Sequence, residues 1–389
     1  MESPGATKFT FHKIAQRRAF LERECRIVFP FTPNRLKPQA HAIAHEKLRN
    51  SMKSPDELKE TVVRAFCFAL VCLMAMIARA EEPASLKLIK TIPLPDVKGR
   101  FDHFAMDVKG QRLFVAALGN NTVEVFDLKA GKRLRSIAGC NKPQGLLFLP
   151  KGNLLFVANG GDGRLRIYDC SSFNPLVTIG SLDDVDNLRY DAKLDRVYVG
   201  YGHGALGVVN PVTGVLTGSI KLLGHPESFQ LERDGNRIFA NVPEAGHVAV
   251  IDRQTRTVLE AWLLPDAQAN FPMALDVWDH RLFVGCRNPA RLVVLDTTAG
   301  KRVNDLAIAG DTDDLFYDAQ HKRIYVSCGE GFLDVIEQRD ADSYRLLEKI
   351  STVPGARTSF FSPELDQFYL AVPRRGEKPA EIRVYDVGK

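Results

Sequence analysis

Seven copies of one short pattern divide the chain from residue 104 onward into nearly equal units, and this repeat constrains the fold more than any other feature. Each copy centres on an apolar stretch with one aromatic residue: Phe114, Phe156, Tyr198, Phe239, Phe283, Tyr325 and Tyr369. Consecutive aromatic residues lie 42, 42, 41, 44, 42 and 44 positions apart. A period in the low forties with several short strands per unit is typical of a β-propeller blade. No unit holds an apolar pattern of period 3.6, so helical solenoids are excluded.

Each unit contains four segments that we expect to be strands, at 104–108, 113–117, 122–126 and 133–138 in the first unit. The second and third segments are almost entirely apolar, which suits strands covered by neighbouring blades on both faces. The fourth carries Lys132, Arg133 and Arg135, and charge on an outermost strand prevents edge-to-edge pairing.

Turn residues follow the same period. Between the first two strands, Gly110, Gly152 and Gly235 are expected to supply a positive φ. A polar residue ends each third strand and is expected to bond the backbone of the next turn; these residues are Asp127, Asp169, Asn210, Asp252, Asp296, Glu337 and Asp386.

The last unit lacks a fourth strand, because the chain ends after residues 381–387. The segment 85–95, which contains the strand-like LKLIKTIPL, precedes the first unit. We predict that this segment completes the last blade and closes the ring, which removes the free sheet edge. The fold class is therefore predicted to be all-β, a seven-bladed propeller of four-stranded antiparallel blades.

The repeats also carry a family resemblance. LLFVANGGDGRLRIYD and RLFVAALGNNTVEVFDLKAGK resemble the YVTN-type repeat of about 40 residues, and the likeness extends from about residue 86 to residue 389. The resemblance implies a bacterial, mostly exported seven-bladed propeller. It implies no single activity, because the family has none.

Residues 1–80 lie outside the repeat. An apolar core at 65–77 is followed by Ala78-Arg79-Ala80, the pattern of a signal peptide cleaved after Ala80. The core is shorter than the ~20 apolar residues of a membrane-spanning helix. We therefore predict a non-native or disordered extension at 1–51, a signal peptide at 52–80 and the propeller at 81–389. Export to the periplasm or the medium follows, with no membrane span in the mature chain.

Charge and cysteine content narrow the class of partner. Residues 1–80 hold 14 of the 52 basic and 7 of the 47 acidic residues, which leaves 38 basic and 40 acidic residues and a net charge of −2 for the propeller. A near-neutral body disfavours nucleic acid, which bulk positive charge would attract. Four propeller cysteines, Cys140, Cys170, Cys286 and Cys328, are expected to be buried free thiols, and we expect a monomer.

Candidate ligand-binding residues gather at one end of the predicted channel. The loops entering each first strand share a face with the loops between the second and third strands, and that face carries Asp102, His103, Asp186, Glu227, Asp313 and Asp314. First strands converge on the axis, so these side chains are expected to meet at the channel mouth. Carboxylates and imidazoles there could bind a divalent cation or a cationic ligand, or supply an acid–base pair. A secondary rim is expected from His203, His225, His247, Arg287 and Arg357.

Two classes of function remain open from the sequence. The first is a binding or interaction module that takes a small molecule or protein at the channel mouth. The second is a propeller enzyme, a hydrolase, lactonase or oxidoreductase that uses the same carboxylates and histidines with or without a divalent metal. No nucleophile–base spacing, metal-binding motif or catalytic residue is identified, so cofactor and catalytic residues stay unassigned.

Overall fold

The computed structural model describes residues 59, 63, 64, 66 and 84–388. The chain divides into a unit of residues 1–80 and a unit of residues 81–389. The predicted extension at 1–51 lies outside the described residues, and the predicted signal peptide is described at only four positions, so both stay predictions. Within the described residues, no helix has the length and apolar character needed to cross a bilayer.

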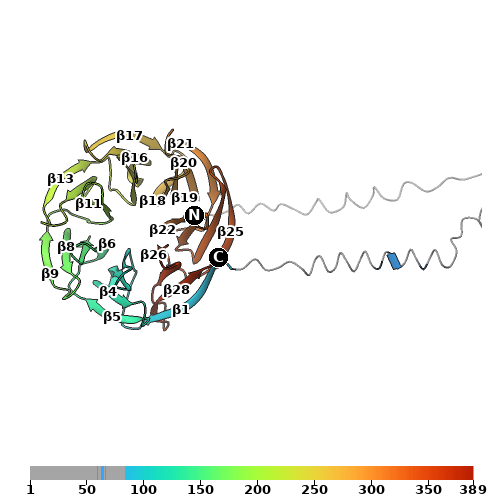
Figure 1. Cartoon of the computed structure of the whole chain (residues 1–389), viewed down its shortest axis with the longest axis horizontal. Helices are drawn as coiled ribbons and strands as arrows, with labels where there is room; N and C mark the ends of the chain where they lie inside the picture. The colour runs from blue at the N-terminus through green and yellow to red at the C-terminus, as the bar shows by residue number, and fades with distance from the viewer. Residues whose placement is uncertain (1–58, 60–62, 65, 67–83, 389) are drawn as a thin grey trace, which may run out of the picture. The chain divides into compact units, whose positions relative to one another are not determined.

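Residues 86–387 form seven four-stranded antiparallel sheets, the blades, arranged in a ring (Figure 1). Each blade runs from an inner strand at the channel to an outer strand at the periphery. The inner strands are β2 (Phe104–Asp107), β6 (Pro143–Leu149), β10 (Leu188–Asp191), β14 (Phe229–Leu231), β18 (Gln268–Asp276), β22 (Thr312–Asp318) and β26 (Ser359–Ser362). The second strands are β3 (Arg112–Ala117), β7 (Leu154–Asn159), β11 (Arg196–Tyr201), β15 (Arg237–Val242), β19 (Arg281–Asn288), β23 (Arg323–Cys328) and β27 (Gln367–Val372).

The third strands are β4 (Thr122–Asp127), β8 (Arg164–Asp169), β12 (Ala205–Val209), β16 (His247–Asp252), β20 (Ala290–Asp296), β24 (Phe332–Asp340) and β28 (Ala380–Val387). The outer strands are β5 (Lys132–Ile137), β9 (Pro175–Ile179), β13 (Leu216–Lys221), β17 (Thr257–Leu263), β21 (Lys301–Ala307), β25 (Ser343–Ser351) and, in blade 7, β1 (Leu86–Leu94). Short 3-10 turns η1 (Leu118–Asn120) and η2 (Pro243–Ala245) follow β3 and β15. The predicted fold class is confirmed.

Ring closure occurs as predicted. β1 pairs antiparallel with β28, from Leu86 opposite Val387 to Leu94 opposite Ala380, and Figure 1 shows this blue strand beside the dark red last blade. Ile92 and Leu94 are buried in the apolar cluster that joins blade 7 to blade 1. The two ends of the propeller are therefore held by both backbone hydrogen bonds and side-chain burial.

The core consists of apolar clusters between neighbouring blades. The cluster between blades 1 and 2 holds Phe114, Val125 and Leu155, which are fully buried, and equivalent clusters fill every other blade interface. The predicted burial of the second and third strands on both faces follows from this packing.

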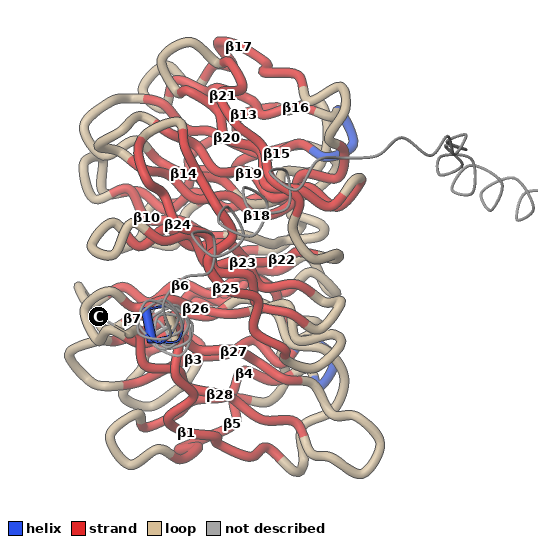
Figure 2. The backbone as a smooth tube through the Cα atoms, turned by 90° about the vertical axis from the view of Figure 1, so that its right-hand side faces the viewer, coloured by secondary structure: helices blue, strands red, loops and turns tan. Residues whose placement is uncertain are grey.

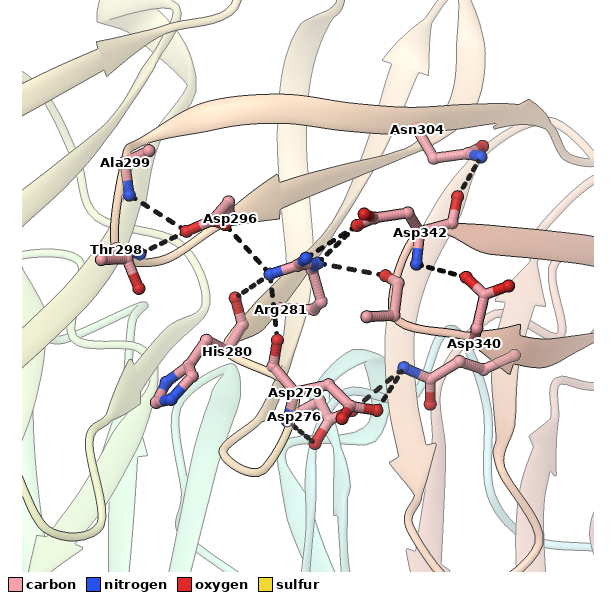
Figure 3. Close-up of polar contacts among 12 residues, drawn as sticks. Asp276, Asp279, His280, Arg281, Asp296, Thr298, Ala299, Asn304, Asp340 and Asp342 are labelled. Atoms are coloured by element: carbon pink, nitrogen blue, oxygen red, sulfur yellow. Dashed lines mark hydrogen bonds and ion pairs between the residues drawn. The ribbon is translucent and has the colours of Figure 1, made fainter.

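A recurring arginine also ties each of several blades to the next one. The first residue of a second strand donates to a backbone carbonyl at the end of the following blade's third strand or just beyond it. The pairs are Arg112 to Cys170 O at 2.7 Å, Arg237 to Thr297 O at 2.6 Å, Arg281 to Ala341 O at 3.0 Å and Arg323 to Gly388 O at 2.7 Å. Figure 3 shows Arg281 between the carbonyls of Asp279 and His280 in its own blade and the Asp342 carboxylate of the next.

The loops lie at the two ends of the strands, as the tan segments in Figure 2 show. Loops that enter inner strands bond loops that follow second strands, for example Gly119 N to Arg100 O at 2.9 Å. We call this end of the ring the mouth face. The opposite face carries the remaining turns, for example Leu128 N to Gln111 O at 2.9 Å.

The expectation for the turn glycines is wrong at two positions. Gly152 has a φ of 88°, whereas Gly110 and Gly235 are not left-handed, and Gln111 takes the positive φ in blade 1. A Cβ at Gly110 would lie 2.1 Å from Asp107 Oδ2, and a Cβ at Gly235 would lie 1.9 Å from Glu232 Oε2, so a larger residue would force these carboxylates to shift.

The polar residues that end the third strands behave as expected in five blades. Asp296, for example, accepts from Thr298 N at 2.6 Å and Ala299 N at 3.0 Å. Asp127, Asp169, Asn210 and Asp252 accept similar bonds. Glu337 instead pairs with Arg339 and Arg345, and no such turn bond is described for Asp386.

All four propeller cysteines are free and buried, as predicted.

Candidate functional site

One structurally equivalent position in every blade supplies a side chain to the channel mouth. In each blade, one inner-strand residue pairs with the middle of the second strand, and the equivalent position lies two residues before it. In blade 1 the paired residue is Phe104, opposite Val115, so the equivalent position is Asp102. The same register defines Asp186 from Leu188 opposite Val199. The seven equivalent residues are Asp102, Gln144, Asp186, Glu227, Phe271, Asp313 and Arg357.

All seven equivalent residues line one pocket of about 130 Å³, which we call the mouth pocket. Its wall is completed by Arg100, His103, Asp184, Asn187, His225, Ser228 and Arg287. The structure therefore brings together five of the six predicted channel-mouth residues and three of the five predicted rim residues. These are Asp102, His103, Asp186, Glu227 and Asp313, and His225, Arg287 and Arg357. Asp314 lies one residue further in and lines the channel below.

Two residues of the predicted rim lie elsewhere. The His203 side chain is 99% exposed at a loop tip and lines neither the mouth pocket nor the channel. His247 is buried at the start of β16, where its Nδ1 lies 3.3 Å from Ala245 O. Neither histidine lines the mouth pocket, since His203 lies in the exposed loop after β11 and His247 is buried at the start of β16.

His103 is the central cation of the mouth pocket. Its Nδ1 lies 3.3 Å from Asp314 Oδ1, and its Nε2 lies 3.8 Å from carboxylate oxygens of both Asp102 and Asp186. Asp314 is held in place by Ser359, whose backbone N–H donates to Oδ2 at 2.7 Å. Burial alone would lower the pKa of His103, but the Asp314 hydrogen bond and the surrounding carboxylates raise that pKa to about 10. His103 is therefore an imidazolium at neutral pH.

Three carboxyl groups of the mouth pocket exchange protons near neutrality. Burial is the main cause that raises the pKa of Asp102, Asp186 and Glu227 to about 7 in each case. Repulsion from neighbouring carboxylates adds to it, whereas the His103 charge lowers all three pKa values. Strongly shifted groups that cluster in a pocket are typical of functional sites.

The two rim arginines are already paired with carboxylates. Arg357 contacts Asp311 at 2.6 Å and Asp313 at 2.8 Å, and Arg287 pairs with Asp313. The Arg287 guanidinium also lies 3.7 Å from the Phe271 ring centroid. Neither arginine is therefore free to hold an anionic ligand without giving up an internal partner.

Glu227 is different, because its carboxyl group lacks a partner within the described part of the chain, and Asp186 Oδ1 has only the His103 imidazole at 3.8 Å. The Glu227 carboxyl forms no hydrogen bond or ion pair there, although it lines the mouth pocket. Asp186 Oδ1 is buried and accepts no hydrogen bond from a described residue. The pocket thus offers acceptor atoms to a ligand rather than donors.

No group of three or more histidine, cysteine, aspartate or glutamate side chains in the described residues has the geometry to hold a metal ion. Asp102, Asp186 and Asp314 instead lie around the His103 cation.

Below the mouth pocket, the channel holds a larger cavity of about 450 Å³, which we call the channel cavity. Residues of all seven inner strands line it, and His103, Asn187 and Ser228 line both spaces. His103 therefore lies at the boundary between the mouth pocket and the channel cavity.

Sequence reasoning missed several lining residues. Gln144 and Phe271 could have been found by aligning the repeats at the Asp102 position, because the strand register fixes that position in every blade. Arg189 could have been found from the two-residue alternation of the inner strand. Arg100 and Asp184 lie in variable loops, where the repeat gives no register.

Comparisons with known proteins support the fold. The sequence matches no protein-family model and no curated protein. A chain of the crystal structure of the mitotic checkpoint complex is 15% identical, with a TM-score of 0.67 over 80% of this chain and 94% of that one. A chain of hydrazine synthase from Kuenenia stuttgartiensis is 18% identical, with a TM-score of 0.65 over 74% of this chain and 96% of that one. At such identities the likeness shows the propeller fold alone.

Proposed function

We propose that this protein is an exported propeller of the YVTN-repeat type that binds a small organic cation in the mouth pocket. The repeat pattern supports the family, and the apolar core at 65–77 followed by Ala78-Arg79-Ala80 supports export to the periplasm or the medium. We further propose that the mature chain acts as a monomer without a membrane span. Its net charge of −2, counted from residue 81 onward, argues against nucleic acid as the ligand.

The observation that carries the proposal is the unpartnered carboxyl of Glu227. Every other carboxyl of the equivalent ring has a cation within 4 Å: Arg100 and His103 for Asp102, His103 for Asp186, and two arginines for Asp313. Glu227 is half-buried, and ionising a carboxyl group that is partly withdrawn from water and has no partner is costly. A ligand ammonium group would stabilise the ionised form of Glu227 and would donate to Asp186 Oδ1, which accepts no hydrogen bond from a described residue, in the same pocket.

An anionic ligand is a poorer match for the mouth pocket. Arg287 and Arg357 are engaged by Asp311 and Asp313, and Arg100 pairs with Asp102, so an anion would have to compete with those pairs. The pocket volume of about 130 Å³ suits the head group of a ligand rather than a whole macromolecule.

The experiment is a calorimetric titration of the purified protein with n-butylamine, 1,4-diaminobutane and the neutral n-butanol. Binding is expected for the amines and not for the alcohol. Glu227→Gln should weaken amine binding about tenfold or more, because a hydrogen bond to a charged group contributes roughly 1.5–3 kcal/mol. The matched control is Glu377→Gln, at an exposed carboxylate in the loop before β28, and it should leave binding unchanged. The proposal is contradicted if Glu227→Gln and Glu377→Gln bind the amines with equal affinity, or if the wild type binds n-butylamine and n-butanol with equal affinity.

An enzyme that uses Glu227 as a general acid–base is the second candidate. Its pKa of about 7 is matched to proton transfer at neutral pH, whereas His103 with a pKa of about 10 stays protonated and would act as a fixed cation. Hydrolase, lactonase and oxidoreductase substrates are the classes to assay. Turnover of a lactone or ester that disappears in Glu227→Gln favours the enzyme, and amine binding without turnover favours the binding module.

A further inference from the structure

The channel cavity has a layered wall. Side chains alternate along a strand, so every second inner-strand residue faces the channel. One layer lies three positions beyond the Asp102 position and consists of Ala105, Leu147, Arg189, Gln230, Ala274, Phe316 and Phe360; all seven line the cavity. Six of these side chains are uncharged. The layer therefore holds a single charge, the Arg189 guanidinium.

Arg189 has few partners for a charged group inside a channel. Its Nη1 donates to the carbonyl of Leu188 at 2.8 Å, and its guanidinium carbon lies 5.7 Å from the Phe229 ring centroid. No carboxylate of the described residues forms an ion pair with it. Asp314, a carboxylate that also lines the cavity, is engaged by His103 and by Ser359 N. A guanidinium has five N–H donors, so most of its hydrogen-bonding capacity is available to a ligand.

The wall opposite Arg189 is aromatic. Arg189 belongs to blade 3, and in a ring of seven blades the opposite side is formed by blades 6 and 7, which carry Phe316 and Phe360. These two rings pack edge to face with centroids 6.0 Å apart, and Phe104 stacks on Phe360 at 6.5 Å. The cavity thus has a cationic side and an aromatic side.

We infer that the channel cavity binds a small organic monocarboxylate with a flat apolar body, its carboxylate on Arg189 and its body against Phe316 and Phe360. A planar guanidinium matches a carboxylate in a bidentate geometry. His103 and Asp314 also line the cavity but pair with each other, so Arg189 is the cation that remains to match one carboxylate. The apolar walls disfavour a strongly hydrated ion such as phosphate. The volume of about 450 Å³ lies in the range of small-molecule sites.

This site is separate from the cation site of the mouth pocket, because the two lie on opposite sides of the His103 layer. Arg189 lines the channel cavity and not the mouth pocket, and Glu227 lines the mouth pocket and not the channel cavity. The inference therefore stands or falls independently of the proposed function.

The test is a calorimetric titration of the full-length protein with benzoate and with its neutral isostere benzamide at neutral pH. Benzoate is expected to bind and benzamide to bind at least tenfold more weakly. Arg189→Met should lower benzoate affinity at least tenfold, whereas Arg135→Met on the outer strand β5 should not change it. Glu227→Gln should weaken amine binding about tenfold or more and leave benzoate binding unchanged.

Equal binding of benzoate and benzamide overturns the inference, as does a benzoate affinity that is the same in Arg189→Met and the wild type. Arg189→Lys guards against a folding defect, because it keeps the charge and loses only the planar fork. It should bind benzoate more weakly than the wild type and more tightly than Arg189→Met. Circular dichroism of each variant verifies that the propeller is intact.

Discussion

Replacing Leu94 by alanine should destabilise the propeller by about 2–5 kcal/mol, the range found when a fully buried leucine is truncated. Leu94 has no exposed surface, and its cluster includes Phe126 of blade 1 and both Tyr369 and Ile382 of blade 7. The alanine variant leaves a cavity at the joint that closes the ring. The loss should fall near the upper half of that range, because strands on both sides of the joint are held by backbone pairing and cannot easily collapse into the cavity.

The assay is urea unfolding followed by far-ultraviolet circular dichroism, with the slope compared between variants to verify that the same surface is exposed on unfolding. The matched control is Ile89→Ala on the same strand, where the side chain is 49% exposed, and it should change stability by less than about 0.5 kcal/mol. Equal midpoints for the two variants would refute the claim that β1 closes the ring through buried contacts.

Two further predictions concern the blade contacts and the mouth pocket. Arg281→Met should lower the free energy of unfolding by about 1–3 kcal/mol in the same urea assay, because Ala341 O and Asp342 in the next blade lose their donor. The control Arg291→Met should lower it clearly less, because Arg291 pairs with Asp305 of its own blade. Equal losses would contradict the role of Arg281 between blades. The folded-state pKa of His103 is raised from 6.5 to about 10, so its contribution to stability is complete below pH 6.5 and is lost as pH rises toward 10. The free energy of unfolding should therefore fall across this range in the wild type and fall less in His103→Gln, and parallel curves would contradict the buried imidazolium.

Most of the fold could be predicted because the same strand pattern occurs in seven units of the sequence. The spacing of aromatic residues from Phe114 to Tyr369 gives the blade count, and the missing fourth strand of the last unit points to the segment 85–95. A comparison of seven units shows only the features that they share, so it does not reveal local features such as the η1 and η2 turns. The repeat did not show that Gly110 lies close to the Asp107 carboxylate and has no left-handed backbone.

The candidate site could be predicted only in part. The inner-strand entries gave Asp102, Asp186 and Glu227 correctly as neighbours, because equivalent positions of a ring converge on its axis. The partners of Arg287 and Arg357 depend on side-chain directions that the repeat does not encode. The near-neutral pKa of Glu227 depends on burial and on the carboxylates of other blades, so it follows only from the assembled ring.

The contacts of the recurring arginine of the second strand could not be predicted from the sequence, for a different reason. Arg112, Arg237, Arg281 and Arg323 recur at one repeat position, so the sequence displays the pattern openly. Their targets are backbone carbonyls in the next blade, about 60 residues further along the chain. A backbone acceptor leaves no residue-type signal, so the contact becomes visible only when neighbouring blades are placed side by side.

The most direct test of the mouth pocket is the proton balance of amine binding, measured by titrating n-butylamine in two buffers of different ionisation enthalpy. Glu227, Asp102 and Asp186 have pKa values of about 7, so at pH 7 a bound cation should displace protons from them into the buffer. Affinity should therefore rise between about pH 6 and 8, where the amine itself stays charged, and Glu227→Gln should reduce both the proton release and the pH dependence. Binding with no proton release and no change in affinity across this range would contradict the account.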